Sequence, residues 1–255
     1  MSDTTLWDSK RAGPTHCSLK LNEFSGPIRL SMEELPFEYM ENKYSYLMPG
    51  GHYTPSNCIA TDKLAVIIPF RDRDTHLRIL LNNMHRFLTK QMLDYSIIVV
   101  EQVANQTLNR AKLFNVGFVE AMLMYPWSCI LFHDVDVLPE DDRILHTCPT
   151  RNPRHMAVAM NKFDYKVVTA GYDVDRYPEN IARYTMIKHS SEPKSNPVNP
   201  CRHKLMELTT RDWREDGLSN LAYKIVRMTH KKLYTHLLVD LLEKEERPLL
   251  ELMFC

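Results

Sequence analysis

Apolar runs alternate with amphipathic stretches between residues 60 and 132 of this chain. Leu64–Pro69, Tyr95–Val100 and Cys129–Phe132 are apolar almost throughout, which is typical of strands buried on both faces. Apolar residues recur at i, i+3, i+4 and i+7 after Asp74–Thr75, which could cap a helix, and a second helical pattern covers Asn109 to about Met124. Strands that alternate with helices predict βαβ units and a mainly parallel sheet.

The pattern is weaker in the second half of the chain. His155–Met160 predicts a fourth strand, and Ala222–Arg227 and Leu233–Val239 predict two late strands. Residues 171–200 are polar and rich in proline, and Glu243–Arg247 is interpreted as a solvated, charged tail.

The first 60 residues are rich in turn formers. Sequences such as Gly26–Pro27 and Pro49–Gly51 predict irregular backbone that packs on a later core. The expected organisation is an arm over residues 1–60, one α/β domain over 61–240 and a tail over 241–255.

Composition excludes several classes of function. Lysine plus arginine and aspartate plus glutamate number 32 each among 255 residues, so bulk attraction to nucleic acid or to an anionic membrane is not expected. The 7 glycines form neither a G-x-G-x-x-G sequence nor a P-loop, which argues against a dinucleotide or Walker-type site. The apolar runs are far shorter than a membrane span and no secretory leader follows Met1, so the chain is soluble as written or has lost an anchor.

The cysteines leave two compartments open. All 6 are separated by more than a C-x-x-C spacing, which argues against a zinc ribbon. They are either free thiols of a cytosolic protein or disulfides of an oxidising lumen. One glycosylation sequon, Asn105–Thr107, favours the secretory route.

Polar clusters follow three of the predicted strands or the loops after them. The clusters are Arg71–Arg73, Asn109–Arg110, and Asp134 with Asp136. Ligands of open parallel sheets bind outside the carboxyl ends of the strands. Basic and acidic groups that meet at one such edge suit a phosphate ligand together with a metal, because guanidinium groups grip phosphate.

Asp134 and Asp136 are the strongest candidates for metal binding. Residues two apart on an extended chain share a face, so their charges repel unless a positive group lies beside them. An Asp-x-Asp sequence after a strand provides hard oxygen ligands for Mg²⁺ or Mn²⁺ held jointly with a diphosphate. The alternative is a pair of turn acids with a capping or surface role.

Other residues give weaker signals. Met186 and His189 are three apart and become neighbours only if that stretch turns; histidine is a reasonable Mn²⁺ ligand, whereas a thioether is soft, so the residues alone favour a packed methionine. His76 and His85 fall on a predicted helix and are explained by packing. Neither a Ser/His/Asp nor a Cys/His arrangement is recognisable.

Taken together, these segments resemble the β-1,4-galactosyltransferase family from about residue 14 to 240. The matching segments are Gly50–Cys58, Ile68–Arg73, Leu108–Phe118, His133–Pro139, Pro153–Met160, Met186–His189, Asp216–Tyr223 and Leu233–His236. The amino-acid sequences of these segments resemble those of invertebrate family members that transfer N-acetylgalactosamine instead of galactose. The resemblance implies a GT-A fold, an α/β architecture with a Rossmann-like mixed sheet, and transfer of a sugar from a UDP donor with inversion, using Mn²⁺.

The resemblance also implies roles for individual residues. The expected donor-binding residues are Pro69, Phe70, Arg71, Arg73, Arg110, Asp134 and Val135. The expected Mn²⁺ ligands are Asp136, Met186 and His189, which reverses the interpretation of Met186 from the residues alone. Arg202 falls near an acceptor-binding residue of the family. Cys17–Cys58 and Cys129–Cys148 match the family's two disulfides, which favours the Golgi lumen.

The chain departs from the family at one place. The family has a Tyr/Phe-Gly-Gly segment and a Trp-Gly-Trp-Gly-Gly-Glu-Asp-Asp loop before the Met-x-x-His pair, whereas here a shortened bridge over residues 161–185 replaces a few dozen residues. The missing loop supplies the general base and the acceptor pocket. Trp213–Gly217 lies too late in the chain to replace it. Asp173 and Asp175 match no family motif and are interpreted as loop acids.

Two hypotheses therefore remain in view. The first is an inverting β-1,4-glycosyltransferase that uses UDP-galactose or UDP-N-acetylgalactosamine, an N-acetylglucosamine or glucose acceptor and Mn²⁺, with impaired activity because the base loop is missing. The second is a non-catalytic, truncated form that keeps part of the nucleotide and metal half and pairs with an intact relative. A cytosolic nucleotide-binding protein with free thiols is disfavoured by the cysteine matches.

Overall fold

The computed structural model describes residues 15–161, 173–189, 204, 207 and 217–246 of the 255-residue chain. Predictions for Arg202, Cys201 and Cys255, for most of Trp213–Gly217 and for residues 162–172 of the bridge lie outside these ranges.

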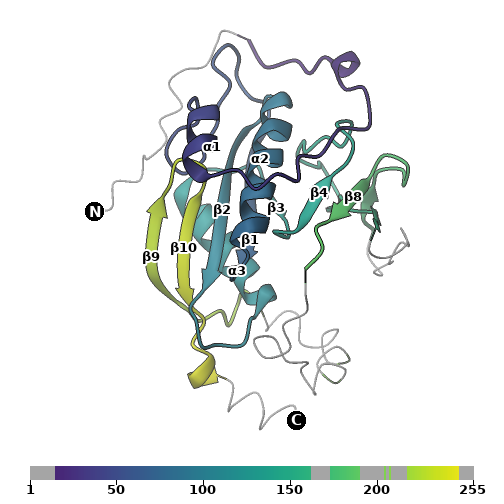
Figure 1. The fold of residues 1–255 in the computed structure, drawn as a ribbon. Coiled ribbons are helices and arrows are strands. Elements are labelled where there is room, and N and C mark those ends of the chain that lie inside the picture. The colour runs from purple at the N-terminus through teal and green to yellow at the C-terminus, as the bar shows by residue number, and fades with distance from the viewer. Residues whose placement is uncertain (1–14, 162–172, 190–203, 205–206, 208–216, 247–255) are drawn as a thin grey trace.

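A five-stranded sheet forms the centre of the fold (Figure 1). Its strands, in spatial order, are β3 (Cys129–Phe132), β1 (Lys63–Phe70), β2 (Asp94–Gln102), β10 (Thr235–Asp240) and β9 (Lys224–His230). The first four run parallel, and β9 pairs antiparallel with β10. The five strands predicted for this sheet, and its mixed α/β character, are confirmed.

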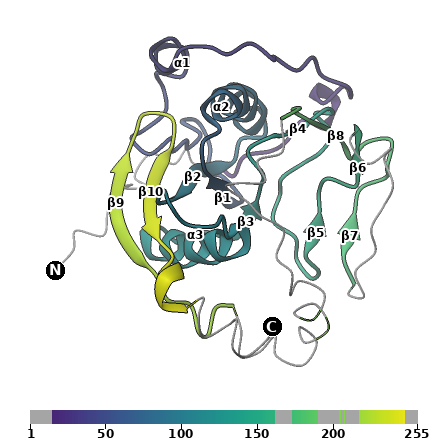
Figure 2. The same cartoon turned by 60° about the horizontal axis from the view of Figure 1, so that its bottom comes forward.

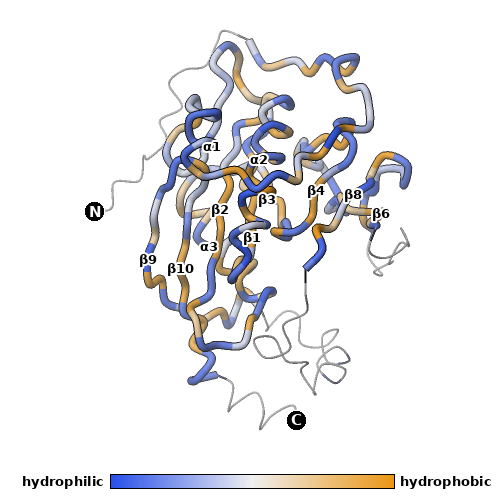
Figure 3. Tube along the Cα trace, viewed as in Figure 1, coloured by the Kyte–Doolittle hydropathy of each residue, from blue (hydrophilic) through white to orange (hydrophobic). Residues whose placement is uncertain are grey.

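Two helices cover opposite faces of this sheet (Figure 2). α2 (Asp74–Lys90) packs on the face that carries Val66 and Ile68, and α3 (Arg110–Met124) packs on the face that carries Ile67. The central strands are therefore buried on both sides, and Figure 3 shows hydrophobic residues along them. This burial explains why their sequences are continuous apolar runs.

Gly117 allows α3 to lie close to the sheet. A Cβ atom at this position would lie 2.3 Å from Cγ2 of Ile67 and 2.9 Å from Cγ2 of Val100. Both distances are shorter than a van der Waals contact, so a larger residue would push the helix away from the strands.

Short strands beside the central sheet form two small sheets (Figure 2). One contains β4 (Val137–Pro139), β8 (Arg183–Met186) and β6 (Ala159–Met160), and the other contains β5 (Arg154–His155) and β7 (Asp175–Arg176). The prediction of one strand over His155–Met160 is wrong. The segment is interrupted because β5 pairs with β7 whereas β6 pairs with β8.

The N-terminal arm packs on the core, but it is not wholly irregular. It contains a 3₁₀ turn, η1 (Leu21–Glu23), and a short helix, α1 (Phe37–Lys43). Met40 and Tyr44 are buried in the same hydrophobic cluster as the apolar side chains of α2. At the far end of the chain, Lys232 Nζ donates to the carbonyl oxygen of Ser45 at 2.9 Å.

Two smaller expectations are corrected. α2 begins at Asp74 with Arg73 at the N-cap and without a side-chain capping bond, so Asp74 and Thr75 do not cap it. The charged tail is not simply solvated, because Glu243 accepts from the backbone N–H of Thr107 at 2.7 Å. Within the described ranges, the helices are too short or too polar to cross a membrane.

Candidate nucleotide and metal site

The carboxyl ends of β1, β2 and β3 meet at one edge of the sheet (Figure 1). β1 ends at Phe70 and β3 ends at Phe132, and the loop after β2 leads into α3 at Arg110. Parallel pairing therefore brings the three predicted polar clusters to the edge where open α/β sheets bind ligands.

The end of β1 and the two arginines that follow it connect two loops at this edge of the sheet. Pro69 and Phe70 are buried, and Phe70 packs in the core beneath α2. Arg71 donates from Nη1 to the carbonyl oxygen of Gln106 in the loop after β2. Arg73 is the N-cap residue of α2, so both arginines flank the start of a 17-residue helix.

Arg110 holds Asp134 in a two-bond ion pair. Arg110 Nε donates to Oδ1 of Asp134 at 2.5 Å, and Nη2 donates to Oδ2 at 2.7 Å. The guanidinium also lies 4.7 Å from the centroid of the Phe114 ring. Asn109 caps α3 by accepting from the N–H of Lys112 at 3.0 Å, which fixes the helix start that carries Arg110.

Asp136, Met186 and His189 come together although about 50 residues separate them in the sequence. β4 pairs antiparallel with β8, so that Met186 lies opposite Val137. The N–H of Ile187 donates to the carbonyl oxygen of Asp136 at 2.7 Å. His189 Nε2 lies 3.2 Å from Oδ2 of Asp136. The structure thus places the three expected metal ligands at one locus.

The two acids of the Asp-x-Asp sequence have separate partners. The prediction that they share a face of an extended chain is wrong, because β3 ends at Phe132 and the chain turns before β4 begins at Val137. Asp134 meets Arg110 and Asp136 meets His189. Their mutual repulsion is therefore relieved by a positive group beside one acid and an imidazole beside the other.

Two further histidines lie at this locus: His76, which packing alone explains in the sequence, and His133, to which the sequence assigns no role of its own. His76 hydrogen-bonds the backbone of Lys188, and its ring lies 6.1 Å from that of His189; burial lowers the pKa of His76. His133 Nδ1 donates to the carbonyl oxygen of Asp134 at 2.8 Å, and burial lowers the pKa of His133. The signal available for His76 was its place one helical turn after the arginine pair.

The donor set at Asp136 is compatible with Mn²⁺. Ligands about 2.1 Å from an octahedral ion lie about 3 Å from each other when adjacent, and the Asp136–His189 distance of 3.2 Å is close to that value. Carboxylate oxygen and imidazole nitrogen are donors suited to Mn²⁺, whereas the Met186 thioether is soft. Among the described residues, no group of three or more His, Cys, Asp or Glu side chains could hold a metal.

The remaining predicted residues lie as follows. Val135 is half-buried and packs against the core. Asn105 is exposed, with a φ of 64°, in the loop beside Gln106. Arg202 lies outside the described residues, so its role stays a prediction.

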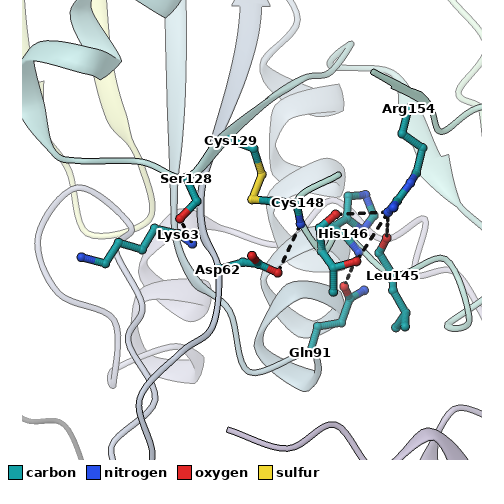
Figure 4. The surroundings of a disulfide bond; sticks show 10 residues. Asp62, Lys63, Gln91, Ser128, Cys129, Leu145, His146, Cys148 and Arg154 are labelled. Carbon is teal, nitrogen blue, oxygen red and sulfur yellow. Dashed lines mark hydrogen bonds between the residues drawn. A yellow bond between two sulfur atoms is a disulfide. The ribbon is translucent and has the colours of Figure 1, made fainter. Parts of the chain in front are cut away.

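Both disulfides that the resemblance implies are present. They are Cys17–Cys58 and Cys129–Cys148. Cys129 begins β3, and the backbone N–H of Cys148 donates to Oδ2 of Asp62 at 3.2 Å (Figure 4). Arg154 also holds the segment before Cys148, because it donates a hydrogen bond to the carbonyl oxygen of Thr147 at 3.1 Å. The second disulfide therefore fixes the strand that leads into the Asp-x-Asp turn.

A mostly parallel sheet with charged loops and a carboxylate–imidazole pair at its carboxyl edge is compatible with a nucleotide-sugar transferase of GT-A type. Comparison with known proteins agrees. The family model for the N-terminal region of glycosyl transferase group 7 matches residues 17–149. The chain is 34% identical to β-1,4-galactosyltransferase 3 of Bos taurus, over 90% of this chain and 68% of that protein. It is 37% identical to β-1,4-galactosyltransferase 4 of Cricetulus griseus, over 75% of this chain and 67% of that protein.

The chain belongs to the β-1,4-galactosyltransferase family. Its fold is similar to the catalytic domain of Drosophila β-1,4-galactosyltransferase 7 in complex with xylobiose, with a TM-score of 0.55 and 26% identity over 71% of this chain and 94% of that one. A mutant of the same Drosophila enzyme, in complex with manganese, UDP-Gal and xylobiose, has a TM-score of 0.50 at 24% identity and shows the shared fold.

The alignments also show a length difference. The alignment with the Bos taurus protein extends over 271 positions, whereas 90% of 255 residues is about 230, so about 40 positions of that relative have no counterpart here. The alignment with the Cricetulus griseus protein extends over 232 positions, whereas 75% of the chain is about 191, which again leaves about 40. Relatives of this family therefore carry residues that this chain lacks.

Proposed function

We propose that this chain binds a UDP-sugar and Mn²⁺ at the carboxyl edge of its sheet and serves an inverting β-1,4-glycosyl transfer. The observation that carries the proposal is the 3.2 Å approach of His189 to Asp136, beside the ion pair of Arg110 with Asp134. The donor sugar is galactose or N-acetylgalactosamine and the acceptor is an N-acetylglucosamine or glucose residue, as the family resemblance implies.

Each residue at the edge has a task in donor binding. Arg71, Arg73 and Arg110 provide guanidinium groups for the diphosphate. Asp136, Met186 and His189 would hold Mn²⁺, which would neutralise charge on the departing diphosphate. Asp134 keeps the Arg110 guanidinium in a fixed orientation. These residues therefore orient the donor and stabilise its leaving group.

Transfer by this chain alone is impaired in our proposal. The acidic loop that supplies the general base and acceptor pocket in the family is missing from the sequence, and relatives carry about 40 positions without a counterpart here. Loss of base catalysis typically lowers a rate by about 10²–10⁴-fold, and loss of acceptor positioning lowers it further. The second candidate function, a non-catalytic form that binds the donor and pairs with an intact relative, rests on the same length difference.

One experiment separates these functions. The chain is incubated with UDP-galactose or UDP-N-acetylgalactosamine, Mn²⁺ and an N-acetylglucosamine or glucose acceptor, and donor binding is measured by calorimetry on the same sample. We expect UDP–Mn²⁺ binding with turnover at least about 10²-fold below that of a full-length relative. Turnover equal to the relative's would refute the impairment, and lack of UDP–Mn²⁺ binding would refute the proposed site.

The disulfides support a lumenal location. Structural disulfides form and persist in oxidising compartments, which agrees with the Golgi lumen proposed from the family resemblance. Exposed Asn105 is then accessible for glycosylation. A thiol titration of the unreduced protein tests the location, because free thiols at all the cysteines would remove this argument.

A further inference from the structure

A cleft lies between the N-terminal arm and α2, away from the nucleotide edge. It has a volume of about 490 Å³, within the range of small-molecule sites. Its lining includes Glu33, Tyr39, Lys43, Asn82 and Arg86. Asn82 lies eight residues after the first residue of α2, which places it about 12 Å along the helix axis from the nucleotide edge.

Hydrogen bonds fix both walls of the cleft. Asn83 accepts from the N–H of Ser31 at 3.0 Å and donates to its carbonyl oxygen at 2.7 Å, which joins the arm to α2. Tyr44 donates its hydroxyl to the carbonyl oxygen of Asn82 at 2.7 Å, which joins α1 to the same helix. The arm and α1, which border the cleft, are therefore both hydrogen-bonded to α2.

Three donor groups line the space. Lys43 Nζ donates to Oδ1 of Asn82 at 2.7 Å, which keeps the ammonium inside the cleft. Within the described part of the chain, Nδ2 of the buried Asn82 has no hydrogen-bond acceptor. Arg86 uses Nη2 to donate to the carbonyl oxygen of Arg29 at 3.2 Å, and a guanidinium carries four further N–H groups.

The two cations repel each other. Partial burial, and then the positive charge of Arg86, lower the pKa of Lys43. Glu33 opposes this effect, but one acid does not balance two cations. An anion placed between Lys43 and Arg86 would relieve the repulsion and would also accept from the Asn82 amide.

Tyr39 adds an apolar surface to the same cleft. Tyr39 is 56% exposed although it lines the space, so much of the residue is accessible to a ligand. Aromatic rings cover the apolar faces of sugar rings well, and the Glu33 carboxylate can accept from sugar hydroxyls. We propose that the cleft between the arm and α2 is a second carbohydrate site, which binds an acidic saccharide through the anionic group held by Lys43, Asn82 and Arg86.

The proposal goes beyond the donor site and does not depend on it. It is tested on the whole chain without UDP or Mn²⁺, by titrating ¹⁵N-labelled protein and following the side-chain signals of Asn82 and Arg86. The probes are glucuronic acid, glucose and inorganic phosphate. Glucuronic acid and glucose differ by the carboxylate, so their comparison isolates the anion.

Matched substitutions separate the cleft from general charge effects. We expect Arg86→Gln and Lys43→Gln each to weaken glucuronic acid binding about tenfold, because each removes a charge-assisted hydrogen bond. Arg227→Gln makes the same charge change on the exposed strand β9 and should leave binding unchanged. Tyr39→Ala should weaken glucuronic acid binding several-fold and leave phosphate binding unchanged. Thermal unfolding of each variant confirms that it is folded.

Four results would overturn the proposal. These are the absence of shifts at Asn82 and Arg86, glucose binding as tightly as glucuronic acid, and an Arg227→Gln effect equal to that of Arg86→Gln. The fourth is phosphate binding as tightly as glucuronic acid with no effect of Tyr39→Ala, which would make the cleft a plain anion site. Because UDP and Mn²⁺ are absent, none of these results bears on the donor site.

Discussion

Arg110 and Asp134 are joined by two parallel hydrogen bonds, of 2.5 and 2.7 Å, across the edge where α3 begins and β3 ends. The pair is well exposed to solvent, with 56% of the arginine side chain and 34% of the aspartate side chain accessible. Exposed ion pairs contribute little to stability, so its geometry points to orientation of the guanidinium for a ligand.

Substitution of Arg110 should therefore separate stability from binding. We expect Arg110→Gln to lower the free energy of unfolding by less than about 1 kcal/mol but to weaken UDP binding about tenfold or more. Arg110→Lys should restore only part of the affinity, because an ammonium cannot make the two-bond contact. Urea unfolding and calorimetry measure the two quantities. Equal loss of stability and affinity would contradict this assignment.

Asp136 and His189 should control metal binding. We expect Asp136→Asn and His189→Ala each to weaken Mn²⁺ binding in the presence of UDP by at least about 100-fold, because the first removes the negative charge and the second the imidazole of a proposed ligand. Electron paramagnetic resonance of free Mn²⁺ measures the affinity. The matched control is Asp173→Asn in the second Asp-x-Asp sequence, which should bind Mn²⁺ as the native chain does. The metal assignment fails if Asp173→Asn and Asp136→Asn behave alike.

The close approach of α3 to the sheet predicts a packing effect. Gly117→Ala should destabilise the protein by about 1–3 kcal/mol, although alanine favours helix by about 1 kcal/mol, because its Cβ would collide with Cγ2 of Ile67. Ile67→Leu removes that branch methyl, so the double variant should be at least about 0.5 kcal/mol more stable than the sum of the single effects. Additive effects in urea unfolding would contradict the contact.

The disulfides should stabilise the protein, and the one that closes the longer loop should contribute more. Loops of 19 and 41 residues correspond to about 3 kcal/mol for Cys129–Cys148 and about 4 kcal/mol for Cys17–Cys58. Replacing both members of either pair with serine should lower the unfolding midpoint accordingly. A reductant should then lower the midpoint of each double variant only by the contribution of the remaining disulfide. An unchanged midpoint in either double variant would contradict the prediction.

His85 should make stability depend on pH. Complete burial lowers the pKa of His85 to about 4, while its ring contacts the hydroxyl of Tyr95 and the carbonyl oxygen of Leu233. Between the ordinary pKa of about 6.5 and this lower value, the unfolded chain binds the extra proton, so stability is lost as the pH falls.

The effect of His85 can be isolated by substitution. From about pH 7.5 to about pH 5, the native chain should lose about 2 kcal/mol more stability than His85→Gln. Urea unfolding at the two pH values measures the difference. His16→Gln, at an exposed position, should keep the pH dependence of the native chain. A His85→Gln variant with the native pH dependence would contradict the assignment.

Local periodicity was sufficient to predict the central sheet and its two helices, because their apolar spacing reflects burial on one or both sides. Local periodicity was insufficient where contacts with distant segments of the chain determine the local structure. α1 has only 7 residues and depends on burial of Met40 and Tyr44, which sequence spacing does not reveal. His155–Met160 was predicted as one strand because an apolar run does not say that its two ends pair with different strands.

Prediction of the candidate site from the sequence has the same limit. Parallel strand order predicted that Arg71, Arg110 and Asp134 lie at one edge, but the pairing of Arg110 with Asp134 depends on the turn after β3. Met186 and His189 were assigned only through the family resemblance, because pairing of β4 with β8 carries them to Asp136. The chemistry of a thioether alone would have excluded Met186.

The contact between the arm and the last strands has a consequence for synthesis of the chain. Ser45 and Lys232 are 187 residues apart, so at about 5–20 residues per second the partner of the arm is made about 10–40 s after the arm itself. Until then the arm can make its contacts with α2, only 38–52 residues away, but not this one. Any factor that delays synthesis of the C-terminal strands therefore delays this last fastening of the arm.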